Sequence, residues 1–383
     1  MPRRIAIIHD WFSVFTGSER VVEQILILYP QADLFSLVDF LPSNERAFLL
    51  EKPVQTSFIQ RLPFARKSFR SYLPLMPLAI EQFDLSRYDL VISSSHAVAK
   101  GVITSPDQLH LSYIHTPIRY AWDMQAAYLR EARLERGPIS WLTRLILHHI
   151  RIWDQRTMNG VDDVATNSQF IARRIWKTYR REAQVIHPPV DLEIFKLYEQ
   201  KEDFYLTASR LVPYKQVKLV VEAFRQMPSR RLVVVGDGPE QAQVRKAAPA
   251  NVQVLGYQPT PTLVSLMQRA RAFVFAAQED FGIAPVEAQA CGTPVIAFGR
   301  GGAVETVRGL NHPQPTGVFF SEQSPTAIVQ AVAQFEENAG RIIPLMCREN
   351  AERFSSKRFQ QEFSAFVEAN WDIFCQSRGK GAH

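Results

Sequence analysis

The sequence predicts an α/β protein of two domains, each built on a parallel sheet, with a cleft between them. Short β-branched runs alternate with helical patterns along nearly all of the 383 residues, which is typical of successive βα units. The alternation breaks at His187–Asp191, where two consecutive prolines interrupt the chain. The length itself corresponds to two or three domains of about 100–200 residues each.

Residues 1–188 are predicted to form the first domain. Its expected strands are Ile5–His9, Leu34–Val38, Leu90–Ser93, Leu109–Ile114 and Asp163–Thr166. Its clearest helical patterns are Ser18–Leu28, Ile139–Asp154 and Gln169–Tyr179. In each case a run of aliphatic or β-branched residues predicts the strand, and apolar residues at helical spacing predict the helix.

Residues 189–383 are predicted to form the second domain. Its expected strands are Phe204–Ala208, Arg231–Val235, Val252–Leu255, Ala272–Ala276, Pro294–Phe298 and Gly317–Phe319. Helices fall between these strands, and three more are expected from Pro325 to about Cys375.

Composition excludes several classes of protein. With 46% hydrophobic and 21% charged residues, the chain is neither disordered nor collagen-like. No apolar run approaches the roughly 18 residues that span a bilayer, and the N-terminus does not read as a signal peptide. Three widely spaced cysteines form neither a disulfide framework nor a zinc pattern, so we expect a cytoplasmic protein.

Net charge is concentrated in the first half of the chain. Residues 1–185 carry 23 basic and 18 acidic side chains, against 21 and 20 in the remainder. The first half is therefore the half expected to meet an anionic partner.

Arg210 and Lys215 are predicted to bind a diphosphate. Arg210 lies two residues after the strand Phe204–Ala208, with only Ser209 between them. Lys215 comes after a short loop, at the start of a helix. Ligands of open parallel sheets bind outside the carboxyl ends of the strands. An arginine there can grip phosphate oxygens bidentately while a lysine supplies a point charge. Two solvated surface charges would be the alternative.

A second group of polar residues, Glu279–Glu287, follows the apolar strand Ala272–Ala276. Glu279 is expected in the loop, where a carboxylate can accept hydrogen bonds from neighbouring hydroxyls of a sugar. Gly282 lets backbone N–H groups approach a ligand closely. Glu287 is expected in the first turn of the next helix, where it could also simply offset the helix dipole.

Two further candidates lie in the first domain. Gly17 opens the first helix and could let a diphosphate approach its N-terminus, although Ser18 could equally be an ordinary cap. His115 follows the strand Leu109–Ile114, where it can hydrogen-bond a sugar hydroxyl or share a proton. Arg119, four residues later, is a candidate to hold an acceptor phosphate.

These motifs together resemble the retaining glycosyltransferases of family 4, also called glycosyl transferase group 1. The resemblance covers nearly the whole chain and is most specific in its last three elements. The residues that carry it are Gly17–Ser18, His115–Pro117, His187–Asp191, Arg210 with Lys215, Gly236–Pro239, and the pair Glu279 and Glu287. The family often has two glycines in the first loop, whereas Thr16 precedes Gly17 here.

The resemblance implies the GT-B fold of two facing Rossmann-like domains, with a last helix (about 358–375) that crosses back to the first, acceptor-side domain. It implies that a nucleotide-sugar is bound through four kinds of contact, three from the second domain and one, that of His115, from the first. Arg210 and Lys215 hold the diphosphate, Glu279 with the backbone of Phe281, Gly282 and Ile283 holds the hexose, Glu287 takes the ribose hydroxyls, and His115 faces the donor sugar.

The implied reaction moves a hexose from a nucleotide diphosphate to a glycan or lipid-linked acceptor, as in cell-surface polysaccharide synthesis. Arg210, Lys215 and helix-terminal N–H groups would stabilise the leaving diphosphate. We expect no cofactor and no metal, since no Asp-x-Asp triplet occurs. The resemblance implies that the transferred sugar retains its anomeric configuration. Because the sequence offers no obvious nucleophile, we favour front-side attack by the acceptor. The segment after His115 resembles mannosyltransferases that use GDP-mannose.

The segment 52–80 is expected to contact a membrane surface or a polyprenyl phosphate. It contains no acid, and apolar side chains are interleaved with its five cations, Lys52, Arg61, Arg66, Lys67 and Arg70. Such a mixture suits the anionic inner face of a membrane.

The helix near Trp141–Trp153 is instead interpreted as an ordinary surface helix. Its expected solvent stripe is Arg144, His148 and Arg151, and its expected core stripe is Leu142, Leu145, Ile146 and Trp153.

Three other functions are alternatives to sugar transfer. A dinucleotide-dependent oxidoreductase needs Gly-x-Gly-x-x-Gly, and Gly236–Gln241 lacks the third glycine. A nucleotide-sugar epimerase of the same fold, or a non-catalytic nucleotide-sugar-binding protein, would keep Arg210, Lys215 and both glutamates, so these two stay open. Nucleic acid is not expected as a partner, because the charge excess is small and no recognition motif is present.

Overall fold

The computed structural model describes residues 3–380, and the chain divides into two compact units. Unit 1 comprises Met1–His187 and Phe359–His383, and unit 2 comprises Pro188–Arg358. The two consecutive prolines therefore begin unit 2, and the chain returns to unit 1 within its last helix.

Unit 1 is built on a seven-stranded parallel sheet. Its strands are β1 (Ile5–His9), β2 (Asp33–Ser36), β3 (Val54–Thr56), β4 (Leu90–Ser95), β5 (Leu109–Ile114), β6 (Asp163–Thr166) and β7 (Gln184–Val185). Its helices are α1 (Gly17–Leu28), α2 (Ala65–Ser68), α3 (Met76–Glu81), α4 (Gln125–Glu131), α5 (Pro138–Thr157) and α6 (Gln169–Tyr179). The edge strands β3 and β7, of three and two residues, were not predicted because runs so short carry no recognisable pattern.

Unit 2 is built on a six-stranded parallel sheet. Its strands are β8 (Tyr205–Ala208), β9 (Leu232–Val235), β10 (Val252–Gly256), β11 (Ala272–Phe275), β12 (Val295–Phe298) and β13 (Gly317–Phe320). Its helices are α7 (Val217–Arg225), α8 (Gln241–Ala247), α9 (Thr260–Arg269), α10 (Ile283–Ala290), α11 (Ala303–Thr306), α12 (Pro325–Glu337) and α13 (Pro344–Glu352). All six strands overlap the predicted ones, and the α/β class with two parallel sheets is confirmed.

Both sheets have an apolar layer on each face, because alternate residues of a strand point to opposite sides. In β1, Ile5 and Ile7 enter the core that α1 shares, whereas Ala6 and Ile8 enter the core beneath α3. In unit 2 the core on one face lies under α7 and α12, and that on the other lies under α9 and α10. Strands buried on both faces are mostly apolar along their length, so polar side chains that can meet a ligand are expected chiefly at the strand ends.

The strand orders show at which strand ends a ligand site is expected. Sheet 1 runs β3-β2-β1-β4-β5-β6-β7, and sheet 2 runs β10-β9-β8-β11-β12-β13. The order therefore reverses between β1 and β4 in unit 1, and between β8 and β11 in unit 2. At such a reversal the connections leave toward opposite sides of the sheet, which opens a crevice at the carboxyl ends of the two strands.

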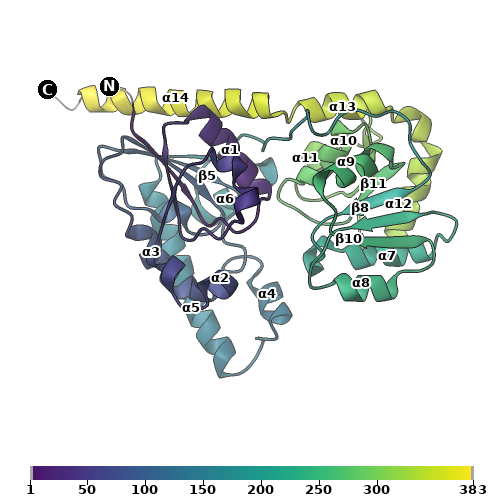
Figure 1. Ribbon diagram of the computed structural model, residues 1–383, viewed down its shortest axis with the longest axis horizontal. Coiled ribbons are helices and arrows are strands. Elements are labelled where there is room, and N and C mark those ends of the chain that lie inside the picture. The colour runs from purple at the N-terminus through teal and green to yellow at the C-terminus, as the bar shows by residue number, and fades with distance from the viewer. Residues whose placement is uncertain (1–2, 381–383) are drawn as a thin grey trace. The chain divides into compact units, whose positions relative to one another are not determined.

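The last helix, α14 (Ser356–Lys380), packs on the sheet of unit 1 (Figure 1, yellow). Phe359, Phe363 and Phe366 are buried in the same core as Tyr113 of β5. The rings of Phe359 and Phe363 stack with centroids 5.6 Å apart. At the surface, Glu368 accepts two hydrogen bonds from Arg3. The C-terminal helix thus belongs to the core formed by the N-terminal strands.

Replacing Phe363 by Ala should destabilise unit 1 by roughly 3–5 kcal/mol, because a fully buried ring is lost and a cavity remains. The matched control is Ile373→Ala, at an exposed position of the same helix, which should change stability by no more than about 0.5 kcal/mol. Denaturant unfolding of the full chain measures both. Equal effects of the two substitutions would show that α14 does not belong to the core.

Candidate functional site

The reversal point of sheet 2 brings together residues from two loops. One loop follows β8 and contains Arg210 and Lys215, and the other, residues 276–282, follows β11. Because β8 and β11 are adjacent parallel strands, both loops leave from the same edge of the sheet. The residues predicted to bind a diphosphate and those predicted to bind a sugar therefore meet at one crevice position.

An ion pair joins the two loops. Lys215 Nζ contacts Glu279 Oε1, and each side chain is only 18% exposed. Lys215 lies in a 3₁₀ turn (Pro213–Lys215), two residues before α7 begins at Val217. Arg210 is exposed, and no described residue is hydrogen-bonded or ion-paired to its guanidinium. One cation is thus engaged by a carboxylate and a second is left open to solvent.

Gly282 directs the second loop into α10. Its φ of +87° is left-handed, which favours glycine, and it forms the N-cap of the helix that starts at Ile283. Phe281 is buried, with its ring 5.4 Å from that of Phe354. The ring anchors the loop, so the backbone N–H groups at the start of α10, which lack partners within the helix, have a fixed position.

Glu287 is buried in the second turn of α10. The expectation that it lies in the first turn is wrong, since α10 begins only at Ile283. A charge one turn further in is poorly placed to offset the helix dipole, whose effect falls off within the first turn. The alternative that Glu287 only offsets the helix dipole is therefore less well supported than the sequence indicated.

The Gly236–Pro239 segment packs against the Arg210 loop. A side chain at Gly236 would place its Cβ 1.9 Å from the carbonyl oxygen of Ser209. The N–H of Leu211 donates to the carbonyl of Asp237 over 2.6 Å. These glycines allow two loop backbones to touch, so this contact explains them without a bound dinucleotide.

At the reversal point of sheet 1, a buried carboxylate organises the loop after β4. Asp10 directly follows β1, and its two oxygens accept hydrogen bonds of 2.6–3.0 Å from four consecutive N–H groups, those of His96, Ala97, Val98 and Ala99. Burial acts to raise the pKa of Asp10, but the charges of His96 and His9 and these N–H donors outweigh it and lower the pKa. Sequence reasoning missed Asp10, although its position after the first strand was a usable signal.

Gly17 starts α1 in the same unit, but its neighbourhood differs from the expectation. The helix cap is Thr16 and not Ser18: the Thr16 hydroxyl and N–H both donate to Glu19 Oε2, over 2.7 and 3.0 Å, in a capping box. Glu19 is buried and its Oε1 lies 3.5 Å from His9 Nε2. Burial acts to raise the pKa of Glu19, but the adjoining His9 and Thr16 lower it to about 2.

His115 at the end of β5 is held by a hydroxyl. Ser94 Oγ lies 2.8 Å from His115 Nε2 and 3.2 Å from His9 Nδ1, and His9 Nδ1 also lies 3.1 Å from the Ser94 carbonyl oxygen. A carbonyl only accepts, so we assign the hydrogen to His9 Nδ1. The Ser94 hydroxyl then donates to His115 Nε2, which leaves the hydrogen of His115 on Nδ1.

The same surroundings keep His115 uncharged. Burial, together with the neighbouring His96 and His9, lowers the pKa of His115 to about 3. A neutral ring can donate one hydrogen bond from Nδ1, but it cannot supply a proton near neutral pH. Of the two roles expected for this histidine, hydrogen bonding is the one that its environment favours.

The structure thus places the predicted site residues in two groups. Within unit 2, Arg210, Lys215, Glu279, Phe281–Ile283 and Glu287 lie on the loops and helix that follow β8 and β11. Within unit 1, Gly17, His115 and half-buried Arg119 follow β1 and β5.

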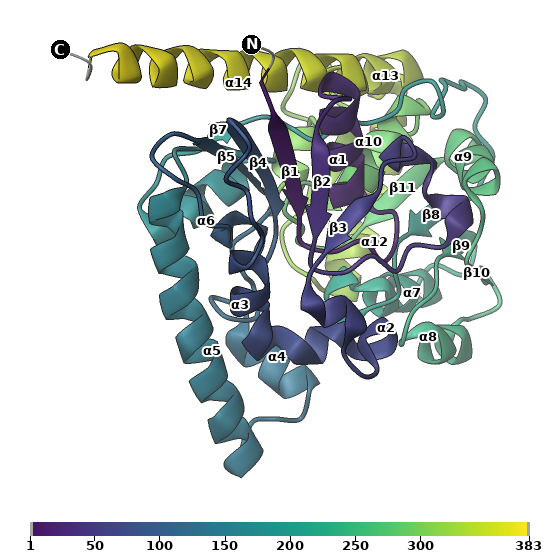
Figure 2. The ribbon, with the colours of Figure 1, turned by 60° about the vertical axis from the view of Figure 1, so that its left-hand side comes forward.

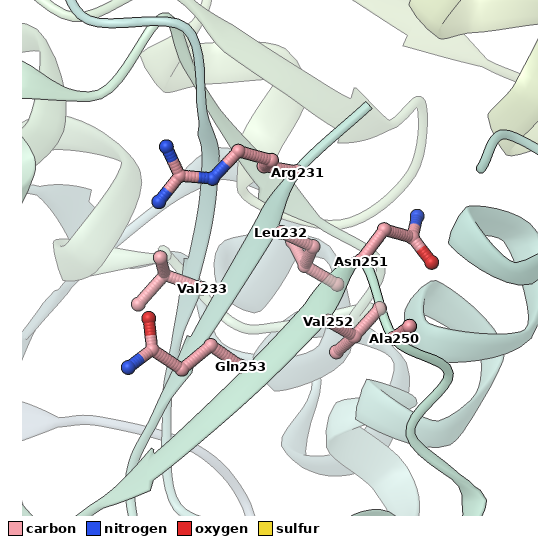
Figure 3. A pocket seen from close by; sticks show the side chains of 7 residues that line it. All are labelled: Arg231, Leu232, Val233, Ala250, Asn251, Val252 and Gln253. Carbon is pink, nitrogen blue, oxygen red and sulfur yellow. The ribbon is translucent and has the colours of Figure 1, made fainter. Parts of the chain in front are cut away.

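A pocket of about 330 Å³ opens elsewhere in unit 2, at the beginnings of β9 and β10. Figure 3 shows the side chains of Arg231 and Gln253 on the same side of these strands. Ligands of parallel sheets bind at the opposite, carboxyl ends, so this pocket lies away from the candidate site. Within residues 3–380 no cluster of three or more His, Cys, Asp or Glu is arranged to hold a metal ion. No helix in that range is long and apolar enough to cross a membrane.

Folding stability should fall as the pH is lowered from about 6.5 toward 4. Burial lowers the pKa of His115 to about 3 and that of His110 to about 4, from an ordinary value of 6.5. In this window the unfolded chain binds protons that the folded chain excludes, so stability is full above the window and lost within it. His115→Asn, and separately His110→Asn, should flatten the pH dependence of the unfolding free energy. Slopes identical to the wild type would contradict the buried, neutral state of these rings.

Comparisons with known proteins show which family the chain is similar to. The model of glycosyltransferase family 4 matches residues 16–194, and that of the group 1 glycosyl transferases matches residues 191–354. A D-inositol 3-phosphate glycosyltransferase of Mycobacterium avium is 29% identical over 182 residues, 41% of this chain and 43% of that protein. One from Mycobacterium marinum is 28% identical over 245 residues, 56% and 51% of the two chains. The chain therefore spans about half or less of the curated relatives that it matches.

Solved structures show the same fold along nearly the whole chain. Anabaena HepE in complex with UDP and glucose is 18% identical, with a TM-score of 0.67 over 96% of this chain and 99% of that one. Sucrose-phosphate synthase from Thermosynechococcus elongatus is 16% identical, with a TM-score of 0.70 over 97% and 100%. At such identities the likeness concerns the fold alone, and the expected GT-B class is confirmed. The chain belongs to glycosyltransferase family 4, the group 1 glycosyl transferases.

Proposed function

We propose that this protein is a retaining glycosyltransferase that moves a hexose from a nucleotide diphosphate to an acceptor hydroxyl. The observation that carries the proposal is the ion pair between Lys215 and Glu279 at the reversal point of sheet 2, with the exposed cation of Arg210 on the same loop as Lys215. A diphosphate needs cations and a sugar needs hydroxyl acceptors, and both are present at one edge of the sheet.

Arg210 and Lys215 bind the diphosphate of the donor. The exposed guanidinium of Arg210 takes phosphate oxygens bidentately, and the ammonium of Lys215 exchanges part of its contact with Glu279 for a phosphate oxygen. Arg210 and Lys215 both precede α7, and a second helix, α10, begins after the loop that carries Glu279. Positive charge is thus gathered on one side of the bond that breaks.

Glu279 and the start of α10 bind the hexose. Once Lys215 turns to the phosphate, the Glu279 carboxylate can accept hydrogen bonds from sugar hydroxyls, and the N–H groups around Phe281, Gly282 and Ile283 are available as donors. Glu287 accepts from the ribose hydroxyls, a role that suits a buried acid one turn into the helix.

In the reaction, the bond between the sugar C1 and the diphosphate oxygen breaks and its electron pair stays on that oxygen. The acceptor oxygen bonds to C1 on the same face, and its proton passes to the departing phosphate oxygen. Arg210, Lys215 and helix-terminal N–H groups stabilise the growing negative charge, so the step as proposed draws on no metal ion and no cofactor.

Unit 1 forms the acceptor side. His115 donates from Nδ1 to a hydroxyl of the donor sugar, Gly17 lets the first loop approach the phosphate, and Arg119 holds an anionic group of the acceptor. The acceptor we favour is a glycan or a polyprenyl-phosphate-linked sugar, handled in the cytoplasm at the inner face of a membrane. The segment 52–80 supports this: Arg61, Arg66 and Lys67 are exposed, although Ile59 and Phe69 are buried in the core.

The nucleobase and the hexose distinguish two donors. The segment after His115 resembles enzymes that use GDP-mannose, whereas the solved HepE structures hold UDP, glucose or UDP-glucose. Both donors present the same diphosphate to Arg210 and Lys215, so the base is read elsewhere.

Lys215→Ala should abolish sugar transfer while the fold survives, because the charge on the leaving diphosphate is no longer compensated. Lys218→Ala is the matched control: that lysine lies one turn away on α7 and pairs with Glu240 over 2.5 Å, so transfer should persist. The assay is release of nucleoside diphosphate with acceptor present. An active variant in which both Lys215 and Glu279 are Ala would refute the assignment. Incubation without acceptor separates the alternatives: an epimeric product indicates an epimerase, and binding without turnover a non-catalytic protein.

A thermal-shift panel of nucleotide-sugars should single out the donor. A ligand at 100 times its dissociation constant stabilises the folded protein by about 2.7 kcal/mol, and GDP-mannose and UDP-glucose are the first two to compare. Arg210→Ala should remove the shift for whichever donor gives one. If no nucleoside diphosphate sugar raises the melting temperature of the wild type, the proposed donor site is wrong.

A further inference from the structure

The long helix α5 of unit 1 has one face that is firmly anchored. Ser140, Leu147, Ile150 and Asp154 are its buried residues. Asp154 forms an ion pair with buried Lys100 and accepts hydrogen bonds of 2.7 Å from Trp122 Nε1 and Tyr179 Oη. Four segments of unit 1 thus meet at one carboxylate, and the rotation of α5 about its axis is fixed.

The opposite face of α5 carries four exposed apolar side chains, with exposed His148, His149 and Arg156 among them. Trp141 is 69% exposed, Leu142 53%, Leu145 38% and Ile152 56%. Their spacing of one, four and eleven residues from Trp141 places them in one stripe along the helix, and none belongs to a hydrophobic cluster of the described chain. We call these four side chains the outer stripe of α5. The expectation that Leu142 and Leu145 face the core is wrong, because Asp154 and its partners take that side.

The charges around the outer stripe have one sign. Within Pro138–Thr157 the basic residues are Arg144, Arg151 and Arg156, and the single acid, Asp154, is buried. Arg144 and Arg156 are exposed, whereas Arg151 is occupied by the carbonyl of Ala121. The loop that leads into the helix adds Arg133 and Arg136, both exposed, against Glu135. The stripe is therefore bordered by cations and has no exposed acid along the helix.

We propose that the outer stripe of α5 docks on the surface of an anionic lipid bilayer. Exposed aromatic and aliphatic side chains with arginines beside them are the chemistry of a helix that lies in the interfacial plane. Trp141 suits the headgroup level, and Arg144 can extend its charged end to lipid phosphates while its stem covers apolar surface. In Figures 1 and 2 the N-terminal half of α5 extends away from the sheet of its unit.

This surface goes beyond the proposed function and differs from the segment 52–80. Leu73 of that segment packs against the cluster of Leu147 and Ile150 on the anchored face of α5, so the two regions form one body. Phe64, 81% exposed, is an apolar side chain that the segment presents to solvent. Variants of the outer stripe and of the segment 52–80 distinguish which of the two makes the larger contribution to membrane binding.

Sedimentation with vesicles tests the proposal on the full chain. Phosphatidylcholine vesicles with phosphatidylglycerol should bind the wild type, and vesicles without it should bind more weakly. The triple variant Trp141→Ser, Leu142→Ser, Leu145→Ser should bind anionic vesicles at least about tenfold more weakly. The matched control is Val304→Ser, Ile343→Ser, Leu345→Ser, exposed apolar positions of unit 2, which should bind as the wild type does. Circular dichroism melts and the thermal shift with donor show that both variants are folded.

Three results would overturn the proposal. The first is equal vesicle binding by the stripe variant and the wild type. The second is loss of binding only in Arg61→Gln, Arg66→Gln, Lys67→Gln, which would assign the membrane contact to the segment 52–80. The third is a lipid-free dimer that the stripe variant abolishes without changing vesicle binding, which would make a second copy the occupant. None of these outcomes depends on transferase activity, so failure here leaves the donor site untouched.

Discussion

The ion pair between Lys215 and Glu279 joins the ends of β8 and β11, the two strands at which the sheet of unit 2 reverses its order. Strands that are buried on both faces present polar side chains to a ligand chiefly at their ends. There a mostly buried cation and a mostly buried carboxylate contact one another across the two loops. In the donor site that we propose, a phosphate oxygen replaces Glu279 as the partner of Lys215, and sugar hydroxyls donate hydrogen bonds to Glu279. Unit 1 follows the same rule, since Asp10 and His115 also stand at strand ends.

Much of this arrangement is readable from the sequence because it depends on local pattern. The runs Leu109–Ile114 and Asp163–Thr166 are predicted with their observed ends, since each is a short buried strand between clear breaks. Arg210 and Glu279 are predictable for a related reason: a parallel strand places the residues that follow it at the ligand-binding edge. The strand runs thus identify both the core and the positions where chemistry can occur.

The remainder depends on contacts between distant segments, which no local pattern encodes. The Ser94 hydroxyl that sets the tautomer of His115 comes from a neighbouring strand, and nothing near either residue predicts their contact. The orientation of α5 is a similar case. Its apolar residues suggest a core stripe, but the ion pair between Lys100 and Asp154 decides which face is buried. Asp154 meets Lys100, Trp122 and Tyr179 on the buried side of the helix, and Leu142 and Leu145 lie on the exposed side.

A crystal structure of the protein with a nucleoside diphosphate sugar tests the central claim most directly. The account predicts that the diphosphate lies within hydrogen-bonding distance of both Arg210 and Lys215, and that a sugar hydroxyl replaces Lys215 as the partner of Glu279. A diphosphate bound at other residues, with the pair between Lys215 and Glu279 intact, would contradict it.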